Sequence, residues 1–402
     1  MTTAVRPPRP TQMVLACYVS FAALGWFLNG FGSILPALED DIGERASLYP
    51  LLPGAVLLVW GLIVVRRHGG IDGPSNNARG VIAGSIALAV GLVVMGITRW
   101  LAVSAIGALA ASIAAAYLIR LLPAVLATIR ADDTERVMMR SNAYSSVAAL
   151  VAPLAVGLSI AVGTGWLPGM AIPIGIAAVA VVISARPSLA DPAPVRAVEH
   201  DVEPDVEPDV EVVPPLRAWW REFTVLGVSI MIEFCFVYFA ATFLHDELDL
   251  STAVAAAGAG AWGIGMATGR FAVSTWPPPR TVLPSVVGIA IGFVMLWGVP
   301  NAAVAIAGIG VAGLGASPLY PSRLTALLDR FPASPHEGSA RGSLASGAAL
   351  MAAPALMAGM RAVSDVRMAY LAIPVLLVVL LALANPFSHA RRTASPLPSP
   401  SS

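Results

Sequence analysis

One carboxylate lies in the middle of a long apolar stretch and is the strongest candidate in the chain for chemistry. Residues 223–244 read FTVLGVSIMIEFCFVYFAATFL, and Glu233 stands about ten residues from either end. A helix of about 20 apolar residues crosses a ~30 Å hydrocarbon layer. An ionised side chain at its centre costs about 2.5–3.5 kcal/mol, so the protonated form is favoured there. We expect Glu233 to carry a proton or to bind a cationic ligand. The alternative is a protonated acid that only hydrogen-bonds a neighbouring helix.

Aromatic and amide side chains mark the first apolar run. Trp26, Asn29 and Ser33 are spaced i, i+3 and i+7, and Tyr18 stands eleven residues before Asn29. This spacing puts all four on one face of a helix. Asn29 would leave its amide unpaired in lipid, so the face should point into the protein. We expect Asn29 to hydrogen-bond a substrate on which Trp26 stacks. The alternative is tight helix packing through neighbouring glycines.

Further candidates lie in three other runs. Tyr117 and Arg120 are three residues apart and share a helix face. Arg120 either snorkels to the lipid headgroups, or attracts an anionic group or pairs with Glu233 inside a cavity. Tyr238 and Tyr320 are substrate-binding candidates, with plain packing as the alternative.

The composition is that of a membrane protein with many spans. Hydrophobic residues make up 57% of the 402 residues and charged residues 12%, about half the charged share of a soluble domain. The runs predict an all-α protein, since a β-barrel would show short alternating strands. The twelve predicted transmembrane helices are 13–37, 47–66, 80–98, 101–123, 142–163, 166–185, 222–244, 252–272, 281–299, 302–327, 341–361 and 366–386.

One polar stretch divides these spans into two sets of six. Residues 186–217 repeat the tetrapeptide Asp-Val-Glu-Pro and are rich in acids and proline, a composition that neither folds alone nor continues a helix. We predict an amino-terminal bundle over 1–185, a disordered acidic linker over 186–217, a carboxy-terminal bundle over 218–390 and a disordered tail over 391–402.

Arginine placement predicts the orientation, because cytoplasmic loops collect basic residues. All 24 basic residues are arginine. If both termini are cytoplasmic, nineteen arginines lie on the cytoplasmic side, Arg120 lies near the inner end of the fourth span, and Arg45, Arg99, Arg361 and Arg367 lie on the other side. We therefore predict a multi-pass protein of the cytoplasmic membrane with both termini inside.

The two sets of spans also repeat each other. Gly61 and Arg66 recur 204 residues later as Gly265 and Arg270, and Arg140 recurs 201 residues later as Arg341. The loop LEDDI at 38–42 recurs as LHDEL at 244–248, an offset of 206. Several landmarks in the same order favour a duplicated six-helix unit.

Two sets of six spans, a cytoplasmic central loop and paired loop motifs together resemble the major facilitator superfamily of secondary transporters. The family's loop after the second helix runs Gly-x-x-x-Asp-Arg-x-Gly-Arg. Gly61 and Arg66 match it, as do Gly265 and Arg270 in the second copy, although neither copy has the acid. The resemblance implies two bundles that rock about a central cavity, lined by the first and fourth helix of each half. It also implies a gating role for these four residues.

Two arginines begin the fifth and eleventh spans on the cytoplasmic side. We expect Arg140 and Arg341 to contact inner-loop acids and to gate that side; the alternative is a role in topology alone. The candidate partners are Asp132, Asp133, Asp329 and Glu337. The fifth span, with Pro153 and Gly157, also resembles the family's antiporter motif. That favours export, and the alternative is helix packing through small residues.

These features together predict a proton-coupled transporter that exports a small molecule. An uptake symporter for a sugar or an organic acid is the first alternative, and a membrane-embedded enzyme or a non-transporting protein of the same fold is the second. The expected partners are a small-molecule substrate, protons and the lipid bilayer, with no nucleic acid, and we expect a monomer. No cofactor or metal is predicted, because the two cysteines lie apart within apolar runs.

Overall fold

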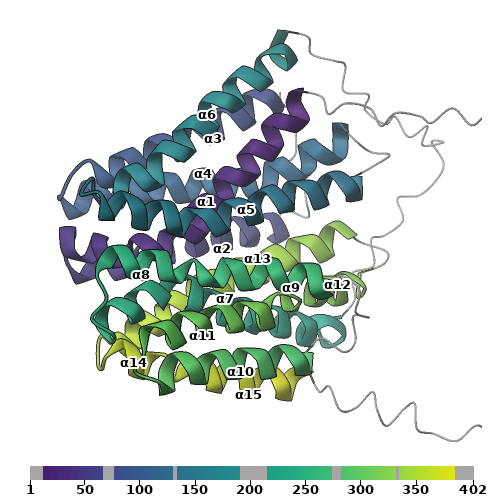
Figure 1. Ribbon diagram of the computed structural model, residues 1–402. Helices are drawn as coiled ribbons and strands as arrows, with labels where there is room; N and C mark the ends of the chain where they lie inside the picture. The colour runs from purple at the N-terminus through teal and green to yellow at the C-terminus, as the bar shows by residue number, and fades with distance from the viewer. Residues whose placement is uncertain are drawn as a thin grey trace, which may run out of the picture.

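The computed structural model describes residues 12–66, 77–129, 134–190, 215–273, 282–331 and 335–384, and these segments are helical with no strand among them. Figure 1 shows two groups of helices stacked one on the other. The amino-terminal group holds α1 (Gln12–Ile42), the short 3-10 helix η1 (Glu44–Leu48), α2 (Leu51–Arg66), α3 (Asn77–Gly96), α4 (Leu101–Ile129), α5 (Thr134–Ala161) and α6 (Trp166–Ala190). The carboxy-terminal group holds α7 (Leu216–Asp246), α8 (Thr252–Ala259), α9 (Ala261–Val273), α10 (Val282–Gly298), α11 (Ala302–Ala316), α12 (Leu319–Leu328), α13 (Pro335–Arg361), α14 (Val366–Ala369) and α15 (Ala372–Ala384).

These helices agree with the predicted membrane-spanning architecture. Backbone polar groups in a bilayer must be paired within their own segment, so long apolar runs become helices. Ten described helical segments are long and apolar enough to cross a membrane, and α10 is a shorter apolar helix. The remaining predicted span, 252–272, is occupied by α8 and α9 in succession.

The structure differs from the predicted spans at their ends. Helices α5 and α13 begin at Thr134 and Pro335, before the predicted starts at 142 and 341. Helix α6 continues to Ala190 and α7 begins at Leu216, so helix occupies both ends of the predicted linker. Residues 191–214 of that linker and the tail from 391 lie outside the described residues.

Three predicted spans of the carboxy-terminal half are interrupted rather than continuous, and the third is broken at residues 370–371 between α14 and α15. The break between α8 and α9 falls at Gly260, and that between α11 and α12 falls at Ser317 and Pro318. Proline has no N–H for the helix ladder, and the Ser317 hydroxyl donates to the Leu314 carbonyl over 2.8 Å. The second break lies just before Tyr320.

The helix order supports the duplication. Helices α1 and α7 begin 204 residues apart, whereas α4 and α11, like α5 and α13, begin 201 residues apart. The starts of these three pairs of helices therefore repeat at nearly the same offset as the sequence landmarks. We call the end where α6 finishes and α7 begins the linker end, and the end where α1 and α7 finish the opposite end.

Helices α1, α2 and α5 join the halves: α1 packs against α7 and α8, α2 against α13, and α5 against α8 and α9. Glycines let these backbones approach closely. A Cβ at Gly32 of α1 would lie 1.9 Å from the Val237 carbonyl oxygen of α7, and one at Gly54 of α2 would lie 2.3 Å from the Met351 nitrogen. The amino-terminal helices slope away from the carboxy-terminal ones toward the linker end (Figure 1).

Candidate functional site

Glu233 lies near the middle of α7, among helices rather than on a lipid-facing stripe. Helix α7 packs against α1, α8, α11, α12, α13, α14 and α15, and every residue from Phe223 to His245 is buried or only partly exposed. Glu233 itself is partly exposed. By contrast, α5 carries an exposed apolar stripe at Val147, Val151 and Leu158. The exposed part of Glu233 therefore opens between helices.

Arg270 of α9 is the basic residue whose charge acts on Glu233. Its guanidinium also crosses to the other half, where Nη1 donates to Ser146 Oγ of α5 over 2.8 Å. The sequence offered a pairing of Glu233 with Arg120 only as an alternative to snorkelling of Arg120, and the family resemblance implied a gating role for Arg270. Helix α9 is held near α7 by α11, which packs against both helices. A Cβ at Gly265 would lie 1.9 Å from the Gly310 oxygen, so the backbones of α9 and α11 touch.

Tyr320 joins the same region from α12, just after the break in the tenth predicted span. Its ring is 37% exposed, and its hydroxyl lies near Ser346 of α13 and within electrostatic reach of Glu233 and Arg270. Four helices of the carboxy-terminal half and α5 of the other half thus meet at Glu233, Arg270, Tyr320, Ser146 and Ser346. We call these five residues the interface cluster.

The predicted residues of the first span lie elsewhere. Tyr18 is buried and stacks on Tyr144 of α5, with ring centroids 5.2 Å apart. The Trp26 Nε1 donates to the Gly169 carbonyl over 3.3 Å, and the Asn29 amide donates to the Gly25 carbonyl of its own helix over 3.0 Å. These two bonds stay within the amino-terminal half, whereas the buried Ser33 hydroxyl has no hydrogen-bond partner among the described residues.

An apolar hollow of about 570 Å³ lies beside this face. It is lined by residues of α1, α5 and α6, including Trp26, Tyr144 and Pro173, and by none from the carboxy-terminal half. The hollow is therefore separate from the interface cluster.

Tyr117 and Arg120 do share a face of α4, and that face is turned toward α2. The Tyr117 ring lies 6.3 Å from the ring of Trp60, and the Arg120 guanidinium lies 5.8 Å from the same ring. Tyr238 is fully buried, and its ring meets Phe31 of α1 at 6.4 Å. Tyr238 therefore packs where the halves meet, and its buried hydroxyl has no hydrogen-bond partner among the described residues.

The predicted gating residues fall in three different settings. A Cβ added at Gly61 would lie 3.4 Å from the Leu344 Cα of α13, which is an ordinary van der Waals contact. The side chain of Arg66 lies outside the described residues. Arg140 is exposed on α5. Arg341 lies over the rings of Trp219 and Phe331, at 4.7 and 5.1 Å. Of the acids proposed as partners, Asp132 and Asp133 and the side chain of Glu337 are outside the described residues.

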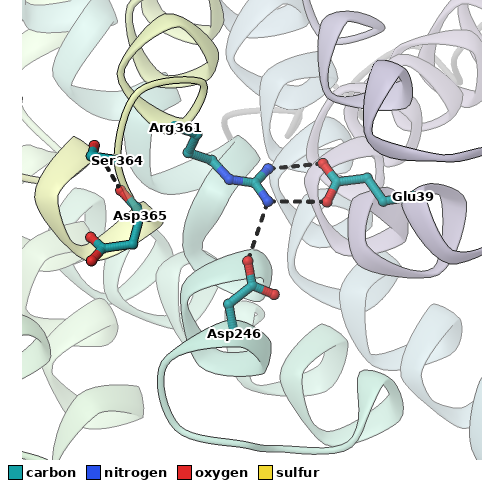
Figure 2. A network of polar contacts seen from close by, with 5 residues as sticks. All are labelled: Glu39, Asp246, Arg361, Ser364 and Asp365. Atoms are coloured by element: carbon teal, nitrogen blue, oxygen red, sulfur yellow. Dashed lines mark hydrogen bonds and ion pairs between the residues drawn. The ribbon is translucent and has the colours of Figure 1, made fainter.

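An ion-pair group that sequence reasoning missed joins the halves at the opposite end. Arg361 of α13 donates from Nη1 and Nη2 to the two carboxylate oxygens of Glu39 of α1, over 2.9 and 3.2 Å. Its Nη2 also meets Asp246 Oδ2 of α7 at 3.2 Å. Figure 2 shows Arg361 between the two acids. We call these three residues the latch.

The latch is partly shielded from solvent, with side-chain exposure of 19% for Arg361 and 13% for Glu39. A bidentate arginine–carboxylate pair adds geometric specificity to its charge. Just beyond α7, burial raises the pKa of the Glu247 carboxyl and the charge of Asp365 raises it further, whereas Arg367 opposes the shift. The sequence signal for the latch was the repeated acidic loop after the first and seventh spans, together with Arg361 on the same side.

No group of three or more His, Cys, Asp or Glu side chains in the described segments could hold a metal ion. Both cysteines are free and buried.

Residues 14–334 match the Major Facilitator Superfamily, and the chain belongs to this family of secondary transporters. The match confirms the predicted fold and the prediction of a transporter rather than an enzyme. No curated protein matches the chain in sequence closely enough to count as a relative.

Solved structures of transporters share the fold. A bacterial homologue of the human lysosomal transporter Spinster, inward-facing and unoccupied, superimposes with a TM-score of 0.68 at 13% identity, covering 98% of this chain and 100% of that one. A variant of the nucleoside transporter NupG gives a TM-score of 0.64 at 16% identity, covering 94% of this chain and 99% of that one. Identities this low establish the shared architecture alone.

Proposed function

We propose that the chain is a proton-coupled secondary transporter of a small molecule in the cytoplasmic membrane, with Glu233 as the proton site. The observation that carries the proposal is the position of Glu233, which is partly exposed on a helix that other helices enclose. A buried carboxylate in a membrane is costly unless it has a function. A side chain that is wetted from one side at a time can take a proton there and release it on the other.

The latch and the interface cluster supply the two-state element that alternating access needs. The arginine distribution of the sequence assigns the linker end to the cytoplasm, so the latch would close the outer side in this conformation. Rocking of the halves would break the bonds of Arg361 to Glu39 and of Arg270 to Ser146, because each joins one half to the other. In this account the two contacts hold the inward-facing state.

Two modes of coupling fit this proposal. Export by antiport is favoured by the motif-like sequence around Pro153 and Gly157. In the structure, Gly157 packs against Ala253 and Ala257 of α8, which supports the packing alternative for that segment. Uptake by symport of an organic acid is favoured by Arg270, because a cation beside the proton site suits an anionic substrate.

Transport into proteoliposomes under an imposed pH gradient tests the proposal and separates its modes. A panel of metabolites and drugs is screened with the interior acid and with the exterior acid. Accumulation driven by an acid interior indicates antiport, and accumulation driven by an acid exterior indicates symport. Asp249→Asn is the matched control for Glu233→Gln, because Asp249 is exposed beyond α7 and has a positive φ of 50° that asparagine tolerates. Transport that is the same with an acid interior and with an acid exterior contradicts proton coupling.

A further inference from the structure

The interface cluster contains one cation and one anion in a region that is otherwise apolar or hydroxyl-bearing. Among the described residues, the ionisable side chains whose charge acts on Glu233 or responds to it are Arg270 of α9 and Tyr320 of α12. The cluster is thus neutral when Glu233 is ionised and carries one positive charge when Glu233 holds a proton. Protonation of Glu233 alone therefore changes the cluster from neutral to positive, and the positive cluster can bind an anion.

Arg270 has the chemistry and the access to hold an anion. Arg270 is exposed, and Nη1 bonds to Ser146. None of the ion pairs between described residues includes Arg270. A guanidinium presents five N–H donors in a planar fork that matches a carboxylate bidentately, so donors remain for a ligand. The Ser146 hydroxyl accepts from this fork, and Tyr320, whose hydroxyl bonds Ser346, lies within electrostatic reach of it.

The position of Arg270 also fits a site that opens to one side at a time. It lies on α9, reaches α5 of the other half, and stands near the interrupted helix α11–α12 that presents Tyr320. Secondary transporters bind substrates where discontinuous helices meet at the interface of their repeats. A ligand held by Arg270 would therefore contact both halves.

We propose that Arg270 binds the carboxylate of a monoanionic small molecule, with the Ser146 and Tyr320 hydroxyls beside it, in the state in which Glu233 holds a proton. This inference rests on the proposed proton site at Glu233. The proton and the anion then occupy the cluster together and cross together, so the coupling is symport. When Glu233 loses its proton, its carboxylate competes for Arg270 and the substrate leaves.

Thermal unfolding of the full-length protein in detergent tests this binding without any gradient. The probes are acetate, lactate and benzoate, with benzamide as the neutral match of benzoate. A ligand that binds only the folded state raises Tm with its concentration. We expect at least one carboxylate to raise Tm in mildly acidic buffer and to lose this effect in alkaline buffer, while benzamide has none.

Variants connect the effect to Arg270. Arg270→Gln should weaken carboxylate binding roughly 10- to 100-fold, since a hydrogen bond to a charged group is lost. Arg270→Lys keeps the positive charge but lacks the planar guanidinium, so it should bind the carboxylate with an intermediate affinity. This variant replaces Arg270→Gln in the test if the glutamine variant folds poorly. Arg45→Gln, at an exposed arginine of η1, should bind as the wild type does.

The failures of the two proposals are distinguishable. If no carboxylate raises Tm in the wild type, or if Arg270→Gln binds one with unchanged affinity, the anion site is wrong. Accumulation driven by an acid interior overturns the symport inference and leaves the proton site at Glu233 standing. Carboxylate binding that is the same in acidic and alkaline buffer contradicts the role of the Glu233 proton.

Discussion

Glutamine at position 233 imitates a glutamic acid that never loses its proton. The account predicts that Glu233→Gln folds and still exchanges substrate across the membrane, because the halves can rock with a neutral side chain in place. Net accumulation driven by a pH gradient should fall to the level of empty liposomes. The measurement compares radiolabelled substrate exchange with gradient-driven uptake in the same proteoliposomes. Full gradient-driven uptake by Glu233→Gln would rule out the carrier role.

The bond between Arg270 and Ser146 predicts a smaller effect. Ser146→Ala removes one hydrogen bond between the halves, which contributes about 0.5–1.5 kcal/mol. The equilibrium ratio of this conformation to the alternative one should therefore fall roughly 2- to 10-fold. The distance between spin labels at Val162→Cys and Val363→Cys reports this equilibrium, because both residues are exposed at the opposite end, one in each half. The two native cysteines are buried.

A matched serine controls for the loss of a hydroxyl. Ser112 of α4 donates only to the Ala108 carbonyl of its own helix, over 2.7 Å. Ser112→Ala should leave the distance distribution between the labels unchanged. An equal shift in both variants would mean that the bond to Arg270 has no special effect on the equilibrium.

Single residues differed in how far the sequence could predict them. Glu233 could be singled out because an acid surrounded by apolar residues is unusual in itself. Its neighbours could not, because Arg270, Tyr320 and Ser146 belong to three other helices whose packing no local pattern fixes. Asn29 was given a substrate role for its polarity, yet its amide bonds the Gly25 carbonyl one turn away.

At the scale of helices, close backbone contacts predict which glycines cannot change. Gly265→Ala would place a methyl group 1.9 Å from the Gly310 oxygen, where backbone rather than a flexible side chain must shift. Overpacking of this kind costs about 1–3 kcal/mol, so Tm in detergent should fall. A Gly265→Ala protein as stable as the wild type would contradict the packing of α9 on α11.

Gly227 of α7 is the control for this substitution, because a Cβ added there would meet no atom within 4 Å. Gly227→Ala should keep Tm or raise it, since alanine favours helix by about 1 kcal/mol. An equal loss of Tm in both variants would mean that the close contact at Gly265 is not the cause.

Hydrophobic runs predicted the helices well and their interruptions poorly. The sequence signals a span by its length and apolarity, which a break at Gly260 or Pro318 hardly alters. Glycine and proline occur in many continuous membrane helices, such as α1 with Pro36 and α13 with Pro354. Tertiary contacts therefore decide where a span breaks.

The latch predicts the balance between conformations of the whole molecule. Arg361→Ala leaves Glu39 without its cation, and a partly shielded pair of this kind contributes about 1–3 kcal/mol, between the values for exposed and buried pairs. The equilibrium ratio of the conformation closed at the opposite end to the open one should fall roughly 5- to 100-fold. The labels at positions 162 and 363 should then report longer distances.

Another ion pair at the same end provides the control. Arg99 approaches Asp41 to 3.6 Å within the amino-terminal half and is largely exposed. Arg99→Ala should not change the distances between the labels, because its pair does not join the halves. If Arg361→Ala also leaves them unchanged, the latch does not hold the two halves together.

The duplicated architecture was visible in the sequence, whereas the state of the molecule was not. Repeated landmarks and twelve apolar runs predicted two equivalent groups of helices. Which end is closed depends on contacts between the groups, and Glu39 and Arg361 are separated by 322 residues. The repeated acidic loop placed acids at the right end but gave no sign of their partner.

The most direct test of Glu233 as the proton site is the movement of protons that substrate entry drives. A pH-sensitive dye is enclosed in proteoliposomes, and a transported substrate is added outside with no gradient imposed. The account predicts that substrate entry changes the internal pH in the wild-type protein, and that Glu233→Gln exchanges the same substrate with no pH change. Substrate entry without any pH change in the wild type, or an unaltered pH change in Glu233→Gln, would contradict it.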